Sequence, residues 1–247
     1  NGEISIRTEV TGGDSIGIEI YNRDGALVTE HRQQVVGKQL ETNIKIETPT
    51  LWNGLKDPYL YSCKVKLLKD DQVYDAVDIP FGFRSFTVDK EKGFFLNGEP
   101  YPLRGVSRHE DRKDKGWAIG YEEHAEDIDL IKEMGANTVR LAHYQQAQDV
   151  YTLCDQAGLV VWAEIPFISA FDASPVAIEN TKTQLAELIM QCYNHPSICF
   201  WGIANEMGIG GESPALYENL EELNDLAHAL DKTRLTTISN LGATKPD

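Results

Sequence analysis

The sequence predicts two domains: an immunoglobulin-like β-sandwich over residues 1–86, and part of a (β/α)8 barrel over residues 87–247. Three observations carry this prediction. Apolar and polar residues alternate up to about residue 85, which is typical of antiparallel strands. After about residue 100, apolar strands alternate with amphipathic helices, which indicates a parallel sheet. The chain has 247 residues, 41% of them apolar, which is enough to form the cores of two domains.

The predicted sandwich consists of short strands separated by turns. The segment Asn22-Arg23-Asp24-Gly25 is a turn signal, and another turn is expected at Asp70 and Asp71. The alternation is carried by Ile4, Ile6 and Val10, by Ile16, Ile18 and Ile20, by Ile44 and Ile46, and by Tyr61, Cys63, Val65 and Leu67. Short strands and turns at this spacing favour a sandwich of antiparallel sheets.

The second region repeats a strand and a helix. Strands are expected at residues 101–108, 138–143, 159–165, 197–204 and 235–239, and helices at 122–134, 147–157, 176–192 and from 214 onward. Gly135 and Gly158 follow the first two helices as stops, and Ser213-Pro214 is a capping pair before the last. The first helix is expected to turn inward the side chains of Ala125, Ile128, Ile131 and Met134.

Two parallel architectures fit this alternation, a doubly wound open sheet and a (β/α)8 barrel. A doubly wound sheet that binds nucleotides has a glycine-rich turn after its first strand, whereas residues 104–112 hold one glycine among charged residues and a histidine. The barrel is therefore favoured. A complete barrel has eight strands, so the chain is expected to contain about five of them and to continue beyond residue 247. Because it starts at Asn1 without methionine, it is also expected to continue before that residue.

Composition excludes several classes of function. The net charge is −16, and Lys and Arg form no block, so a nucleic-acid partner is not expected. No apolar run is long enough to span a membrane. A soluble protein is expected, located in the cytoplasm, the periplasm or outside the cell, and a homo-oligomer is left open. The four cysteines lack metal-binding spacing and are expected to be buried free thiols.

Polar residues gather where the predicted barrel strands end. In such a barrel the carboxyl ends of the strands form one rim, and catalytic residues lie there. The four runs end in Arg108-His109-Glu110-Asp111, in Arg140 and His143-Tyr144, at Glu164, and in Asn205-Glu206. A carboxylic acid surrounded by hydrogen-bond donors is what glycosidic cleavage requires. Glu206 is the predicted acid and base, because a carboxyl group at the edge of an apolar strand is suited to hold a proton near neutral pH.

Each residue also has a simpler interpretation. Glu206 alone could be a solvated strand end, His109 and His143 could be buried histidines bonded to the backbone, and Glu164 could pair with Arg140. No HxH or HExxH spacing supports a metal site, and none is predicted. The prediction of a sugar-cleaving site depends on the coincidence of four strand ends, not on any one residue.

At these runs the sequence resembles the family 2 glycoside hydrolases, the group that contains β-galactosidases, β-glucuronidases and β-mannosidases. The run 191-QCYNHPSICFWGIANE-206 is similar to the acid/base motif of that family, and 137-NTVRLAHY-144 to its other signature. The run 105-GVSRHED-111 resembles the first barrel strand of the β-galactosidase branch. The stretch 51-LWNGLKDPYLY-61 with 82-GFR-84 resembles the end of the sandwich that precedes the barrel.

The resemblance implies a retaining β-glycosidase with two catalytic glutamates, which acts on a terminal β-galactoside. It implies that Glu206 is the acid/base and that Asn205 binds the 2-hydroxyl of the sugar. The predicted substrate-binding set is completed by His109, His143, Glu164 and Arg140, of which Arg140 matches an arginine that supports the nucleophile. The alternatives are a β-glucuronidase, a β-mannosidase and a non-catalytic carbohydrate-binding relative.

The sequence also departs from the family pattern. The nucleophilic glutamate of the family lies at the end of the seventh strand, beyond residue 247, so this chain alone is expected to have little or no activity. The amino-terminal jelly-roll domain of the family is not expected within these 247 residues either. Gln145 stands where the family usually has a proline after His-Tyr. The segment 164-EIPFIS-169 lacks the histidine with which some β-galactosidases bind magnesium. No cofactor is predicted, and a magnesium or sodium ion near Glu206 is left open.

Overall fold

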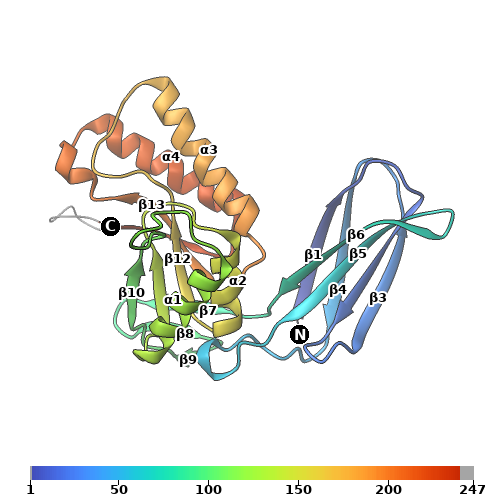
Figure 1. Cartoon of the computed structure of the whole chain (residues 1–247). Coiled ribbons are helices and arrows are strands. Elements are labelled where there is room, and N and C mark those ends of the chain that lie inside the picture. Colours follow the sequence, from blue (N-terminus) through green and yellow to red (C-terminus); the bar gives the residue numbers. More distant parts are fainter. Residues whose placement is uncertain (1, 240–247) are drawn as a thin grey trace.

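Residues 2–81 fold into two antiparallel sheets in the computed structural model, which describes residues 2–239 (Figure 1). One sheet pairs β1 (Gly2–Glu9) with β4 (Gln39–Ile46), and the other has the order β3 (Leu27–Gln34), β2 (Ser15–Tyr21), β5 (Tyr61–Lys69), β6 (Gln72–Phe81). Alternate side chains of these strands meet between the sheets, and Ile18 and Ile20 are fully buried there. The predicted immunoglobulin-like sandwich is confirmed.

Strands β3 and β6, the two edges of the four-stranded sheet, were not predicted. Most side chains of both strands face solvent, including Val73 and Val77, which are 57% and 52% exposed. An edge strand is covered less than a central one and needs less apolar alternation. The pattern from which strands are predicted is therefore weakest at these two positions.

A small three-stranded sheet joins the sandwich to the α/β region, and it was not predicted either. It consists of β7 (Phe86–Asp89), β8 (Gly93–Leu96) and β9 (Glu99–Pro100). Phe94 and Leu96 of β8 pack with Trp52, Val160 and Cys199, close to the amino ends of the parallel strands. The small sheet covers this end of the parallel sheet (Figure 1), and the predicted site residues lie at the opposite end.

The predicted strand over residues 101–108 is wrong in its first half. Tyr101 bonds the carbonyl of Phe94 through its backbone N–H and packs with the small sheet. Pro102 has no N–H to give to a neighbouring strand. The parallel pairing therefore begins only at Gly105.

The α/β region is built on five parallel strands that lie side by side in chain order. These strands are β10 (Gly105–Arg108), β11 (Thr138–Leu141), β12 (Val160–Glu164), β13 (Ile198–Asn205) and β14 (Leu235–Ser239). A doubly wound sheet reverses its strand order at a switch point, whereas this order never reverses. The predicted incomplete (β/α)8 barrel is thus confirmed. Residues 240–247 of the predicted barrel domain lie outside the described residues.

Four helices in the described residues follow the first four parallel strands and cover the outer face of the sheet (Figure 1). They are α1 (Tyr121–Glu133), α2 (Gln148–Ala157), α3 (Pro175–Cys192) and α4 (Pro214–Leu230). The hydroxyls of Ser174 and Ser213 cap α3 and α4, and Gly158 ends α2 with a φ of 76°. Met134, predicted to point inward, is 65% exposed because α1 ends before it.

Two arginines hold the loop between α3 and β13. Arg84, at the end of the sandwich, donates to the carbonyls of Pro196 and Ile198 at 3.0 and 2.7 Å. Arg234 donates to the carbonyls of Tyr193, His195 and Ile198. The carbonyls at the start of β13 are thus fixed from two sides, which sets the register of the strand that carries the predicted acid/base.

All four cysteines are buried free thiols, as predicted. Burial raises the pKa of Cys63 and of Cys192 to about 11, so neither is a nucleophile near neutral pH. In the part of the chain that the structure describes, no helix is long and apolar enough to cross a membrane.

Candidate active site

The carboxylate of Glu164 is the centre of the polar cluster at the carboxyl end of the sheet. Arg140 Nε donates to its Oε2 at 2.9 Å, and Arg140 Nη2 donates to its Oε1 at 3.0 Å. The side chain of Glu164 is 1% exposed. A buried carboxylate needs such paired donors. The pair joins two neighbouring strands, because Arg140 lies on β11 and Glu164 on β12.

His143 is hydrogen-bonded to the same carboxylate, and this bond determines which of its two ring nitrogens carries the hydrogen. Its Nδ1 lies 2.6 Å from Glu164 Oε1, so Nδ1 carries a proton and donates it. Arg140 Nη2 is 3.2 Å from the same nitrogen, but two donors do not bond each other. In the neutral ring, Nε2 is then an acceptor. A partly exposed His143 is therefore suited to accept a hydrogen bond from a sugar hydroxyl.

Asn205 ends β13 and is 2% exposed. Its Oδ1 accepts from Arg140 Nη2 at 2.6 Å. This bond fixes which way the amide faces, because a guanidinium only donates. The Nδ2 group of Asn205 is directed away from Arg140 with its hydrogens available to a ligand oxygen.

Glu206 leaves the strand in the left-handed backbone conformation, with φ 55° and ψ 34°, and the turn η2 (Met207–Gly210) follows. Its N–H donates to the carbonyl of Ser239 in β14 at 2.6 Å. A residue other than glycine in such a conformation costs about 1–3 kcal/mol, and such strain is concentrated at functional sites. Glu206 is partly buried and directly follows Asn205 in the chain.

Aromatic rings continue the site toward the surface. His109 is exposed, and the centre of its ring lies 5.0 Å from the ring centre of His143 and 6.0 Å from that of Tyr144. The ring centre of Tyr144 in turn lies 5.0 Å from that of Trp117, with the two rings tilted by 33°, and Trp117 is 70% exposed. Ring faces and imidazole nitrogens of this kind suit the C–H and hydroxyl groups of a sugar.

The structure thus brings all six predicted site residues to one edge of the sheet. Arg140, His143, Glu164 and Asn205 form one bonded network, and His109 and Glu206 flank it. The carboxylate of Glu164 is enclosed by Arg140 and His143, a geometry that fits a residue which positions its neighbours. The roles of all six residues in binding and catalysis stay predictions.

Trp162, Gln146 and the exposed Trp117 of the site were not found from the sequence. Trp162 lies under the guanidinium of Arg140, 4.4 Å from ring centre to charge. Its position two residues before Glu164 on a strand was a usable signal, because such residues share a face. Gln146 bonds the backbone beside both histidines, and no spacing rule would have found it. In residues 2–239, no group of three or more His, Cys, Asp or Glu side chains could hold a metal ion.

Gly202 gives the buried carboxylate its space, and we expect Gly202→Ala to disturb it. An added Cβ would lie 2.3 Å from Trp162 Nε1 and 2.4 Å from Glu164 Cβ. Overpacking of this kind costs about 1–3 kcal/mol, so the midpoint of denaturant unfolding should move to lower denaturant concentration. Gly17→Ala in β2 is the control, since its nearest neighbour would be 3.4 Å away. Equal unfolding midpoints for the two variants would contradict the close approach.

Comparison with protein families agrees with this architecture. The family description "Glycosyl hydrolases family 2" matches residues 3–84, and "Glycosyl hydrolases family 2, TIM barrel domain" matches residues 86–246. The two matches together account for nearly the whole chain. They fall on the sandwich and on the α/β region respectively.

The relatives are named for different sugar substrates. A β-glucuronidase of Bacteroides fragilis is 48% identical over 199 residues, which are 78% of this chain and 28% of that protein. A β-galactosidase of Thermoanaerobacter pseudethanolicus is 33% identical over 246 residues, 95% of this chain and 32% of that protein. The crystal structure of an FMN-binding β-glucuronidase from Facaelibacterium prausnitzii L2-6 superposes with a TM-score of 0.89 at 38% identity.

That superposition covers 99% of this chain and 40% of the other, so the chain spans less than half the length of each of these three relatives. The two family descriptions agree with the observed sandwich and with the order of the parallel strands. This chain belongs to the family 2 glycosyl hydrolases.

Proposed function

We propose that the polypeptide containing this chain is a retaining β-glycosidase in which Glu206 is the acid/base. The observation that carries the proposal is the bonded network of Arg140, His143, Glu164 and Asn205, with Glu206 as its immediate neighbour. In support of the proposal, Asn205 of the network offers an amide donor and His143 an imidazole acceptor, and the partly buried Glu206 directly follows Asn205 in the chain. Hydrolysis of a glycosidic bond needs a carboxylic acid to protonate the leaving oxygen and a second carboxylate, and hydrogen bonds to the sugar hydroxyls assist it.

The proposed mechanism has two steps. Glu206 protonates the glycosidic oxygen while a glutamate from outside residues 2–239 attacks the anomeric carbon, and the leaving alcohol departs. Glu206, now a carboxylate, then removes a proton from a water molecule that releases the sugar. Asn205 is assigned the 2-hydroxyl, and His143 and His109 are assigned other hydroxyls of the same terminal sugar.

Two sugars are supported by different observations. The relative at 48% identity is named a β-glucuronidase, so we place β-glucuronides first, ahead of the β-galactosides favoured by the sequence analysis. A glucuronide carries a carboxylate that needs a cation, and Arg140 is already paired with Glu164. If the sugar is a glucuronide, its cation is expected from residues outside 2–239. A β-galactoside is uncharged and needs no such group.

A panel of nitrophenyl β-glycosides tests the proposal. The full-length polypeptide is incubated with the glucuronide, the galactoside and the mannoside, and release of nitrophenol is followed. We expect turnover of the glucuronide above the other two. Turnover of the galactoside alone would keep the mechanism and change the sugar. A folded protein that binds sugars but hydrolyses none would favour the alternative, a non-catalytic carbohydrate-binding protein.

A further inference from the structure

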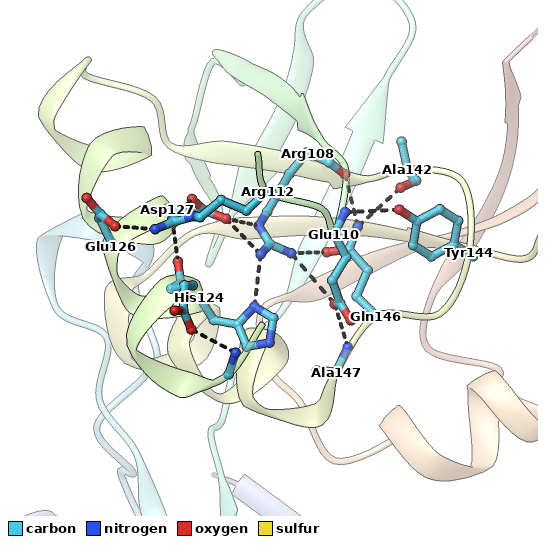
Figure 2. Close-up of polar contacts among 12 residues, drawn as sticks. Arg108, Glu110, Arg112, His124, Glu126, Asp127, Ala142, Tyr144, Gln146 and Ala147 are labelled. Atoms are coloured by element: carbon cyan, nitrogen blue, oxygen red, sulfur yellow. Dashed lines mark hydrogen bonds and ion pairs between the residues drawn. The ribbon is translucent and has the colours of Figure 1, made fainter. Parts of the chain in front are cut away.

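The side-chain amide of Gln146 bonds the backbone of Arg108 and of Ala142 (Figure 2). Its Nε2 donates to the carbonyl of Arg108 at 2.9 Å and to the carbonyl of Ala142 at 3.2 Å. His109 follows the first carbonyl and His143 follows the second. One buried amide therefore bridges the carboxyl ends of β10 and β11 at the points from which the two imidazoles extend.

The direction of this amide is fixed by Arg108. Gln146 Oε1 accepts from Arg108 Nη1 at 2.5 Å, and only an acceptor can face a guanidinium. Arg108 is itself 5% exposed and is held by Asp127, with bonds of 3.0 and 2.8 Å, and by His124 at 2.9 Å. Nε2 is consequently the group that faces the two carbonyls, and its two hydrogens match two acceptors.

A second connection joins the same two loops from the other side. The N–H of Glu110 donates to the Tyr144 hydroxyl at 3.0 Å, and the Glu110 carboxylate accepts from the N–H of Ala147 at 2.8 Å. Figure 2 shows these bonds around the Arg108 guanidinium. The loop that carries His109 and the loop that carries His143 are thereby held as one unit.

We infer that Gln146 is a positioning residue, which sets the separation of His109 and His143 so that both reach hydroxyls of one terminal sugar. The two rings lie 5.0 Å apart, and adjacent hydroxyls of a pyranose are spaced closely enough to be bound by such a pair. The inference rests on the proposed function for its catalytic consequence. Its structural content, the spacing of the two rings, can be measured separately.

Gln146→Glu in the full-length polypeptide is the test. The change is isosteric and leaves Arg108 an acceptor with a favourable charge, but it places an oxygen against two carbonyls where two donors had been. We expect kcat/KM for the terminal sugar to fall about 10–100-fold, mainly through KM, because misplaced binding groups weaken the substrate complex. In a series of monodeoxy substrates, the loss should shrink for the sugar that lacks the hydroxyl bound by the histidines.

Gln145→Glu is the matched control. It changes the neighbouring glutamine in the same way, but the amide of Gln145 bonds Gln191 at 2.7 Å on the surface. Its kcat/KM should stay within about twofold of the parent, as is usual for exposed substitutions. Comparable losses for both variants would overturn the inference.

A spectroscopic readout separates the inference from the proposed function. The imidazole resonances of His109 and His143 should shift in Gln146→Glu, because each ring lies in the ring current of the other, while those of His31 in the sandwich should not. If no glycoside is hydrolysed but these two resonances move, the positioning role stands and the proposed function fails. Unmoved resonances overturn the inference whatever the kinetics. Should Gln146→Glu not fold, Gln146→Asn, whose amide is too short to reach both carbonyls, is measured in the same way.

Discussion

Replacing Glu206 by glutamine should lower kcat/KM by about 10²–10⁴ for glycosides with poor leaving groups, the usual contribution of a positioned proton donor. Gln keeps the size of the side chain and its half-buried place beside Asn205, so the fold and the sugar contacts should persist. What it removes is the proton that the departing alkoxide needs. A dinitrophenolate leaves without that proton, so the first step should be nearly unaffected for dinitrophenyl glycosides.

The measurement is a leaving-group series on a single sugar, from dinitrophenyl to alkyl glycosides. Rates of the variant should depend steeply on the acidity of the leaving group, and azide should restore the second step, because this anion attacks the glycosyl intermediate without a general base. Glu212→Gln, which changes an exposed carboxylate a few residues later, is the control and should leave kcat/KM unchanged. Equal losses for every leaving group would remove Glu206 from the acid role.

The site could be located from the sequence because parallel strands share one direction. The carboxyl ends of all such strands meet at one edge, so polar residues after four apolar runs were expected to meet there. The structure brings together Arg140, His143, Glu164 and Asn205. Arg140 and Glu164 lie on different strands, and the register in which β11 pairs with β12 brings them within hydrogen-bonding distance. Periodicity predicts which face a residue lies on, and topology supplies the neighbour.

Other features could not be read from the sequence because they depend on contacts without a periodic signature. The hydrogen bonds of Gln146 join two loops after different strands, and an isolated buried glutamine has no characteristic spacing. The Asn-His-Pro-Ser run of the acid/base motif is another feature that depends on such contacts. His195 Nδ1 lies 2.6 Å from Asp155 Oδ2, and the N–H of Ser197 donates to the same carboxylate at 3.0 Å. These residues precede β13, so they fix the start of the strand whose other end carries Glu206.

Replacing Glu164 by alanine should destabilise the barrel by about 3–5 kcal/mol, the range measured when one partner of a buried ion pair is removed. Arg140 would keep only Asn205 as an acceptor within the network, and its side chain is 17% exposed. An uncompensated guanidinium in that position is costly. Unfolding by denaturant, followed by tryptophan fluorescence, should show the loss. Glu19→Ala is the control, because Glu19 pairs with Lys66 on the sandwich, where both side chains are about a fifth or more exposed; it should cost about 1 kcal/mol or less.

The double variant Glu164→Met with Arg140→Met tests whether this ion pair stabilises the fold or orients Asn205 and His143. Apolar residues of similar volume can replace a buried ion pair with little loss of stability, so the double variant should be more stable than Glu164→Ala alone. Its activity should not recover, because Asn205 loses the donor that orients its amide and His143 loses the carboxylate that fixes its protonation. Recovery of both stability and kcat/KM would mean that the network only fills space. Recovery of stability alone would show that burying these charges serves the orientation of the sugar-binding groups rather than the fold.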